Sequence, residues 1–138
     1  MFRQKSRQQK GITIVEFTAV SALFMLMIFA IIEGGRYIYT KGAIAHLARE
    51  GARYAAVRGA QATKDPLRTG DAPATQSSVD AYIENRSPVG GVTTTLTWSP
   101  NNTPGSEVTV TVSYQFTSLI TLLNEVDVTN SATSIVYF

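Results

Sequence analysis

The sequence contains no cysteine, and its single histidine is His46. Without cysteine the chain has neither a disulfide nor a thiolate for a metal, although an oxidising compartment remains permitted. One imidazole without a second histidine or a cysteine does not complete a transition-metal site. We therefore expect no metal and no cofactor.

Groups arranged for catalysis are also lacking. Gly90 and Gly91 precede an expected strand, whereas a phosphate-binding loop follows one. The carboxylates of the C-terminal part show no paired spacing with a base or a metal; they are Asp65, Asp71, Asp80, Glu84, Glu107, Glu125 and Asp127. We expect no enzyme. Nucleic-acid binding is not expected either, because no basic stripe interleaved with aromatic residues follows the basic N-terminus.

The first long apolar run predicts a transmembrane helix. It covers Ile12 to Ile32, reads ITIVEFTAVSALFMLMIFAII, and contains one ionisable residue, Glu16. At about 1.5 Å per residue this helix covers roughly 30 Å, the thickness of a hydrocarbon core. The basic residues Arg3, Lys5, Arg7 and Lys10 precede it without an acid among them. By the positive-inside rule the N-terminus is cytoplasmic and the C-terminal part is periplasmic or extracellular.

A cleaved secretory signal peptide is the simplest alternative. Such a signal has an apolar region of about 7 to 15 residues and a small-residue cleavage site. The run here is longer, contains Glu16, and continues into a helix-compatible sequence without a clear A-x-A site. These features favour a helix that stays in the membrane.

Glu16 lies one helical turn inside the apolar run, where a carboxylate costs about 2.5 to 3.5 kcal/mol on insertion scales. Two interpretations remain open: the side chain reaches the cytoplasmic headgroups near Lys10, or it has a specific partner. Gly11 stands at the junction of the basic leader and the apolar run. Cleavage after Gly11 would leave an amine on Ile12, and this amine would pair strongly with Glu16 of a neighbouring helix in a low dielectric.

The stretch GITIVEF resembles the class III signal of pilins, in particular the TadE-like minor pilins of tight-adherence systems. The resemblance implies that a prepilin peptidase recognises Gly11, Ile12, Glu16 and Phe17 and cleaves after Gly11. The letters ITIV depart from the small residues of many relatives. The resemblance continues to Val57 through E-x-G-R and A-R-E-G-A-R elements, formed by Glu33, Gly35, Arg36, Ala48, Arg49, Glu50, Gly51, Ala52 and Arg53.

One long helix from about Ile12 to about Arg58 is expected, because no proline interrupts it and the residues of one helix face recur every three to four positions. That face contains Tyr37, Ile44, Leu47, Gly51, Tyr54 and Arg58. The glycines of this region favour either close packing or a looser helix. Arg49, Glu50 and Arg53 form either a functional cluster or, as we favour, a solvated flank.

The remaining chain predicts a small α+β domain. The segment 75–88 favours a short helix with Thr75 or Ser77 as N-cap, a buried stripe of Val79, Tyr82 and Ile83, and Pro88 beyond its end. VTTTLTW, EVTVTVSYQF and VDVTNSATSIVYF predict three antiparallel strands, with SLITLLN as a helical or looped crossing. In the second strand, Val108, Val110, Val112 and Tyr114 share one face, and Thr109, Thr111 and Ser113 share the other.

The expected architecture is pilin-like: a long N-terminal helix packed on a three-stranded sheet with one extra helix. Its segments are a leader at 1–11, a transmembrane helix at 12–33, a stalk helix at 34–58, an exposed linker at 59–74 and a domain at 75–138.

As a function we expect a minor pilin of a tight-adherence pilus, involved in pilus assembly, adhesion or secretion and located in the inner membrane or incorporated in a pilus. The resemblance implies as partners the membrane, a prepilin peptidase, other pilin or pseudopilin subunits and the inner-membrane assembly platform. An uncleaved, single-pass periplasmic binding protein is the alternative. A type II secretion pseudopilin is a third option, but it usually has phenylalanine after the scissile glycine, where Ile12 stands here.

Overall fold

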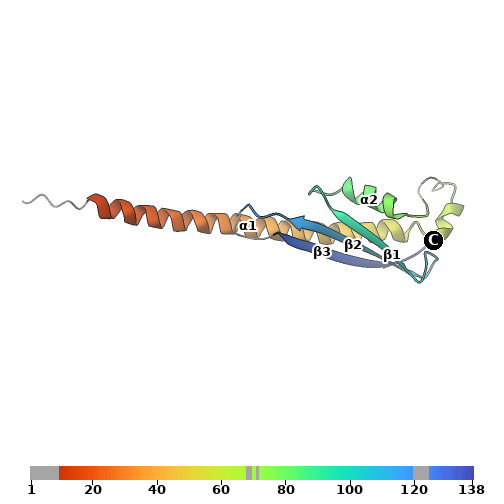
Figure 1. The fold of residues 1–138 in the computed structure, drawn as a ribbon. Coiled ribbons are helices and arrows are strands. Elements are labelled where there is room, and N and C mark those ends of the chain that lie inside the picture. Colours follow the sequence, from red (N-terminus) through yellow and green to blue (C-terminus); the bar gives the residue numbers. More distant parts are fainter. Residues whose placement is uncertain (1–9, 68–69, 71, 120–124) are drawn as a thin grey trace, which may run out of the picture. The chain divides into compact units, whose positions relative to one another are not determined.

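The computed structural model describes residues 10–67, 70, 72–119 and 125–138. The chain divides into two compact units, of which the first ends at Gly35 and the second comprises Arg36–Phe138. The described residues form helices α1 and α2, a short 3-10 helix η1, and strands β1, β2 and β3 (Figure 1).

Helix α1 (Lys10–Ala56) contains 47 residues and confirms the predicted long helix. It ends two residues before the expected Arg58, where the chain turns. The absence of proline leaves its backbone hydrogen bonds intact along this length. Of the predicted leader, Arg3, Lys5 and Arg7 lie outside the described residues, whereas Lys10 and Gly11 form the start of α1.

Helix α2 (Gln76–Glu84) begins where the sequence predicts a short helix. Thr75 is the N-cap, and its side chain accepts a hydrogen bond from the Ser78 backbone N–H at 3.2 Å. Ser78 in turn accepts from the Thr75 backbone N–H at 2.9 Å, which completes a capping box. Val79 and Ile83 are buried, as predicted, and Tyr82 is half-buried.

The three predicted strands are β1 (Thr93–Ser99), β2 (Glu107–Phe116) and β3 (Val126–Ile135). They form an antiparallel sheet in the order β1-β2-β3, so that β1 and β3 are its edges (Figure 1). Strand β3 is three residues shorter than the expected 126–138 segment. Of the expected crossing SLITLLN, residues 120–124 lie outside the described chain.

The two faces of the sheet differ as the alternation predicts. Val108, Val110 and Val112 are fully buried on the inner face. On the outer face hydroxyl groups pair across strands: Thr109 with Thr133 at 2.9 Å and Thr111 with Ser131 at 2.8 Å. Such cross-strand hydroxyl pairs stabilise the exposed face without apolar surface.

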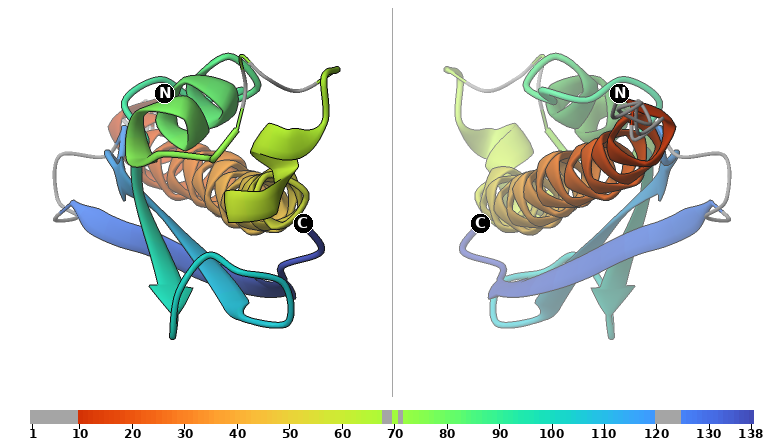
Figure 2. Two further views of the ribbon diagram at one scale, coloured as in Figure 1. Left: turned by 90° about the vertical axis from the view of Figure 1, so that its right-hand side faces the viewer. Right: turned by 90° about the vertical axis from the view of Figure 1, so that its left-hand side faces the viewer.

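The inner face of the sheet and helix α2 both pack on the second half of α1 (Figure 2). The core contributed by α1 is rich in small side chains, which allow the elements to approach closely. Its members from α1 are Ile44, Leu47, Ala48, Ala52, Ala55 and Ala56.

The segment 59–74, expected as an exposed linker, is packed at both of its ends. It contains η1 (Ala60–Lys64), and Gly59, Ala62 and Ala74 are buried. The Ala60 N–H donates to the Asn102 carbonyl at 2.8 Å, and the Ala74 N–H donates to the Arg58 carbonyl at 2.8 Å. Between these ends Gln61, Thr63, Lys64, Pro66 and Leu67 are exposed, so the small residues at the ends serve close packing while the middle of the segment is open to solvent.

Candidate functional site

The residues expected to form the processing site lie in the first two turns of α1. Gly11, Ile12, Glu16 and Phe17 are all exposed; Ile12 is 69% and Phe17 72% accessible. Ile12 and Glu16 are separated by one helical turn and therefore lie on the same face of α1. A carboxylate and the potential new N-terminus thus share one side of the helix.

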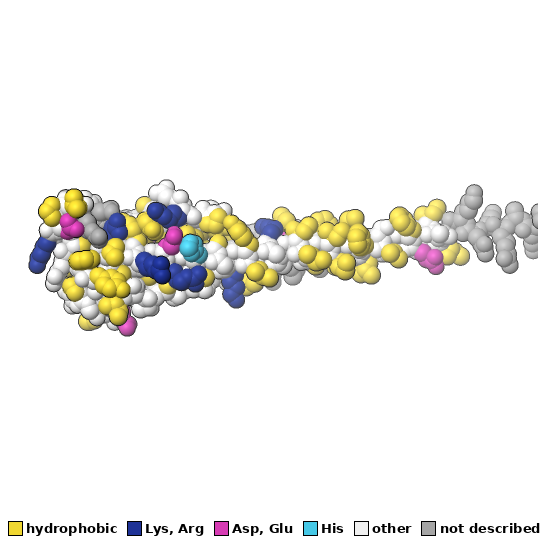
Figure 3. All heavy atoms as spheres, turned by 180° about the vertical axis from the view of Figure 1, so that it is seen from behind, with side chains coloured by type: hydrophobic (Ala, Val, Ile, Leu, Met, Phe, Trp, Pro, Cys, Tyr) yellow, Lys and Arg dark blue, Asp and Glu magenta, His cyan; other side chains and the backbone are white. Residues whose placement is uncertain are grey.

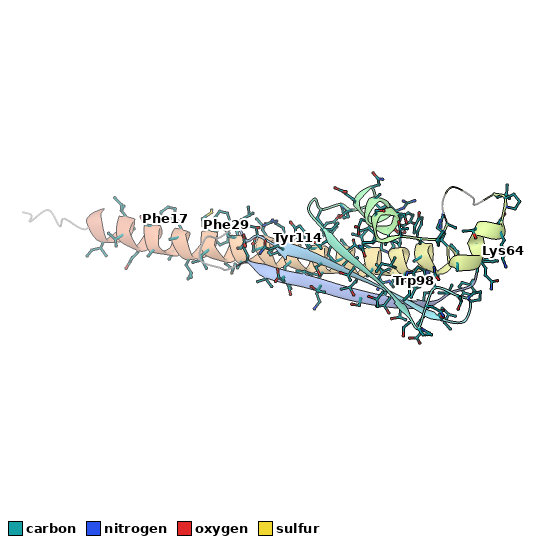
Figure 4. The ribbon with its side chains drawn as sticks, turned by 45° about the vertical axis from the view of Figure 1, so that its right-hand side comes forward. Phe17, Phe29, Lys64, Trp98 and Tyr114 are labelled. Atoms are coloured by element: carbon teal, nitrogen blue, oxygen red, sulfur yellow. The ribbon has the colours of Figure 1, made fainter. Side chains whose placement is uncertain are left out.

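The first unit has an apolar surface that no described part of the chain covers. Among the described helices α1 is long and apolar enough to cross a membrane, and none of its most apolar stretch is buried. Phe17 and Phe29 project outward from it (Figure 4). Within this stretch the Thr18 hydroxyl donates to the Ile14 carbonyl at 2.8 Å, so this polar group has a partner without water. Such a surface fits lipid or other apolar helices.

The E-x-G-R residues stand where the first unit ends and the second begins. Glu33 is 7% accessible, and the Gly35 Cα faces open space, since an added Cβ would meet nothing within 4 Å. In the second unit the Arg36 guanidinium lies 5.2 Å from the centroid of the Phe116 ring. Tyr37 contacts the same ring edge-on, with the ring centroids 5.6 Å apart. Phe116 thus contacts both Arg36 and Tyr37, and the sequence alone did not predict these contacts.

The A-R-E-G-A-R residues divide between two faces of α1. Ala48, Gly51 and Ala52 are buried, and a Cβ on Gly51 would lie 2.7 Å from Ile83 Cδ1 and 3.0 Å from Val110 Cγ1. Gly51 therefore permits close packing on α2 and the sheet, whereas Gly34, Gly35 and Gly42 have open space. This glycine supports the close-packing interpretation for one position of the stalk.

The charged residues of the same motif point outward. Arg49 and Arg53 are exposed, and within the described chain neither forms an ion pair. Glu50 is within 3.4 Å of His46 Nε2, one helical turn away. Figure 3 shows Lys and Arg side chains exposed on the visible face of the second unit, with acidic side chains and a histidine among them. The favoured solvated flank fits this arrangement.

The described residues contain no group of three or more histidine or acidic side chains that could hold a metal ion. The His46 side chain is 65% exposed, and its Nε2 lies 3.4 Å from Glu50 Oε1.

A stack of four side chains, which the sequence did not reveal, joins α1 to α2. Tyr54 and Tyr82 stack with ring centroids 4.1 Å apart and an angle of 29° between their planes. The guanidinium of Arg58 lies 3.9 Å from the Tyr54 centroid, and that of Arg86 lies 3.9 Å from the Tyr82 centroid. The partners are 28 positions apart, so local periodicity carries no signal for this pairing.

Residues 11–53 match a family model described as TadE-like protein. This chain carries a TadE-like segment. The segment begins at the glycine of GITIVEF and ends at the last arginine of AREGAR, so that it lies within α1. It indicates a protein associated with a Tad pilus. The sheet and α2 lie outside the matched residues, and no curated protein and no solved structure matches the chain.

Proposed function

We propose that this chain is a minor pilin of a tight-adherence pilus, matured by a prepilin peptidase and built into or priming the pilus. One observation carries the proposal: the TadE-like segment begins with an apolar helix that no described part of the chain covers. A helix that stays uncovered in its own chain associates by packing against lipid and other helices. The small α+β domain that follows is then carried outside the cytoplasm.

Maturation begins at the bond between Gly11 and Ile12. The basic residues that orient the N-terminus toward the cytoplasm all precede this bond, so the peptidase removes them with the leader. The apolar helix follows the bond and remains in the inner membrane. The product begins with a protonated amine on an apolar helix.

Assembly then pairs the Ile12 amine of one subunit with the Glu16 carboxylate of its neighbour. Both groups lie on one face of α1 and would be buried together when helices associate. Burying either charge alone is costly, whereas the two charges attract each other strongly once water is excluded. Breaking such a pair by removing one member leaves a buried charge. The pair therefore sets the axial register of neighbouring helices.

The cleavage step is tested by the intact mass of the protein extracted from membranes that contain the peptidase. We expect the wild type to begin at Ile12 and Gly11→Val to begin at Met1. Gly42→Val is the matched control, because Gly42 is exposed with open space around it, and it should be cut normally. A wild-type chain that keeps Met1 would contradict maturation and would support an uncleaved single-pass protein.

The register step is tested by Glu16→Gln, with Glu50→Gln as the control that removes a carboxylate from the domain. We expect both variants to be cleaved, and only Glu16→Gln to be lost from sheared pilus fractions by at least tenfold, since its neutral amide cannot form an ion pair with an ammonium group. Normal incorporation of Glu16→Gln would refute the register role while leaving cleavage intact.

A further inference from the structure

The two edge strands of the sheet differ in how their outward backbone groups are hydrogen-bonded. At β1 the side-chain amide of Gln76 acts as a strand would: its Nε2 donates to the Thr94 carbonyl at 2.8 Å, and its Oε1 accepts from the Leu96 N–H at 2.8 Å. Helix α2 packs beside this edge. Two backbone groups at the edge of β1, the Thr94 carbonyl and the Leu96 N–H, are thus paired within the chain itself.

Strand β3 has no such cover among the described residues. It pairs with β2 over its whole length, from Val126 to Ile135, and has no hydrogen-bonded neighbour on its other side. Natural edge strands are usually blunted by proline, lysine, a bulge or short length. Strand β3 contains ten residues with no proline and no lysine, and its one charge, Asp127, is near its start. It is an open template for another strand.

A groove runs between this edge and the exposed flank of α1. Its volume is about 570 Å³, and Arg49 and Arg53 are its charged lining residues. The other lining residues are Ala52, Val57, Ala132, Thr133, Ser134 and Tyr137. The chain crosses from β3 to α1 at Tyr137, whose N–H donates to the Ala56 carbonyl at 2.9 Å. The groove therefore combines an open strand edge with two guanidinium groups and no acid.

We propose that this groove binds an extended acidic peptide segment of a partner protein, which adds as a strand to β3. Alternate residues of a strand lie about 6.6 to 6.8 Å apart on one face. Arg49 and Arg53 are four residues apart on α1, about 6 Å along its axis. Carboxylates at every second position of the added strand would thus face successive arginines. Each carboxylate could accept two parallel hydrogen bonds from the guanidinium group of its arginine.

The two parts of the groove have separate tasks in this proposal. Backbone hydrogen bonds to β3 supply affinity without regard to sequence, and the arginines select acidic side chains at alternate positions. The site belongs to the second unit alone, and the proposal does not depend on cleavage at Gly11.

The test uses the full chain in detergent micelles and a short fluorescent peptide in which glutamate alternates with valine and threonine. We expect a rise in anisotropy that weakens with added salt, because the charges remain partly solvated. A peptide with lysine in place of glutamate should not bind. A peptide N-methylated at alternate residues, which keeps its charge but cannot extend the sheet, should bind at least tenfold more weakly.

Variants locate the site. The double variant Arg49→Gln, Arg53→Gln should weaken binding by about tenfold or more. Arg86→Gln removes an equal charge from a position outside the groove and should change affinity less than about twofold. Gln76→Ala opens the other edge and should leave the affinity at β3 unchanged.

Four results would overturn the proposal. The N-methylated peptide could bind with full affinity, or the arginine double variant and Arg86→Gln could lose the same amount of affinity. Single-stranded DNA or polygalacturonate could compete as strongly as the unlabelled acidic peptide, or the chain could self-associate through the groove and exclude the peptide.

Discussion

At the scale of single residues, Gly51 links the TadE-like motif to the packing of the domain. Its missing side chain leaves room for Ile83 from α2 and Val110 from β2. A glycine inside a helix costs about 1 kcal/mol of propensity relative to alanine, so this contact has to compensate for that loss. The motif position is therefore explained by contact within the chain.

Replacing Gly51 by a β-branched residue tests this explanation. We predict that Gly51→Val lowers the free energy of unfolding by about 2 to 3 kcal/mol, because its methyl groups overlap Ile83 and Val110. Gly42→Val, at a helix position with open space, should change it by less than about 0.5 kcal/mol. Denaturant unfolding of the detergent-solubilised protein, followed by Trp98 fluorescence, measures both. Equal stability of the two variants would contradict close packing at Gly51.

At the scale of elements, the stacked rings of Tyr54 and Tyr82, with an arginine over each ring, hold α2 on α1. Helix α2 contains only nine residues, and isolated helices of this length are marginal in water. Its capping box and the stack together compensate for that short length.

A double-mutant cycle measures this contact. We predict that Tyr54→Leu and Tyr82→Leu are coupled by about 0.5 to 1.5 kcal/mol beyond their separate effects on stability. Tyr54→Leu combined with Tyr37→Leu should be additive, since Tyr37 instead contacts Phe116. The same unfolding experiment reports both cycles, and additivity for the stacked pair would show that the rings do not couple.

At the scale of the whole molecule, the proposed function requires one orientation across a membrane, with the basic N-terminal segment on the cytoplasmic side and the folded domain on the other. Because the native chain lacks cysteine, single cysteines report that orientation without background. Lys64 is exposed in η1 and offers a position in the second unit.

We predict that a membrane-impermeant maleimide labels Lys64→Cys in intact spheroplasts. In a host without prepilin peptidase, Gln4→Cys should be labelled only after lysis, because the basic residues around it stay in the cytoplasm. The wild type has no cysteine and is the unlabelled control. Labelling of position 4 before lysis, or of position 64 only after it, would reverse the proposed topology.

The sequence predicted the elements well because their signals are local. The long helix follows from apolar and stalk periodicity without proline, and Thr75, the alternating valines of β2 and the turn prolines delimit the rest. The segment 59–74 differs because small residues are ambiguous: they suit a flexible linker and also the close packing found at Gly59 and Ala62. Composition alone does not distinguish these two uses.

What the sequence determined by itself is therefore the apolar helix with Glu16, the motif residues from Gly11 to Arg53, and the order and type of the helices and strands, since each depends on neighbours a few positions apart. Only the tertiary structure decided that Gly51 meets Val110, that Gln76 covers the edge of β1, and that the edge of β3 lies open beside Arg49 and Arg53. These contacts join distant residues, and which of them form depends on how the whole chain packs.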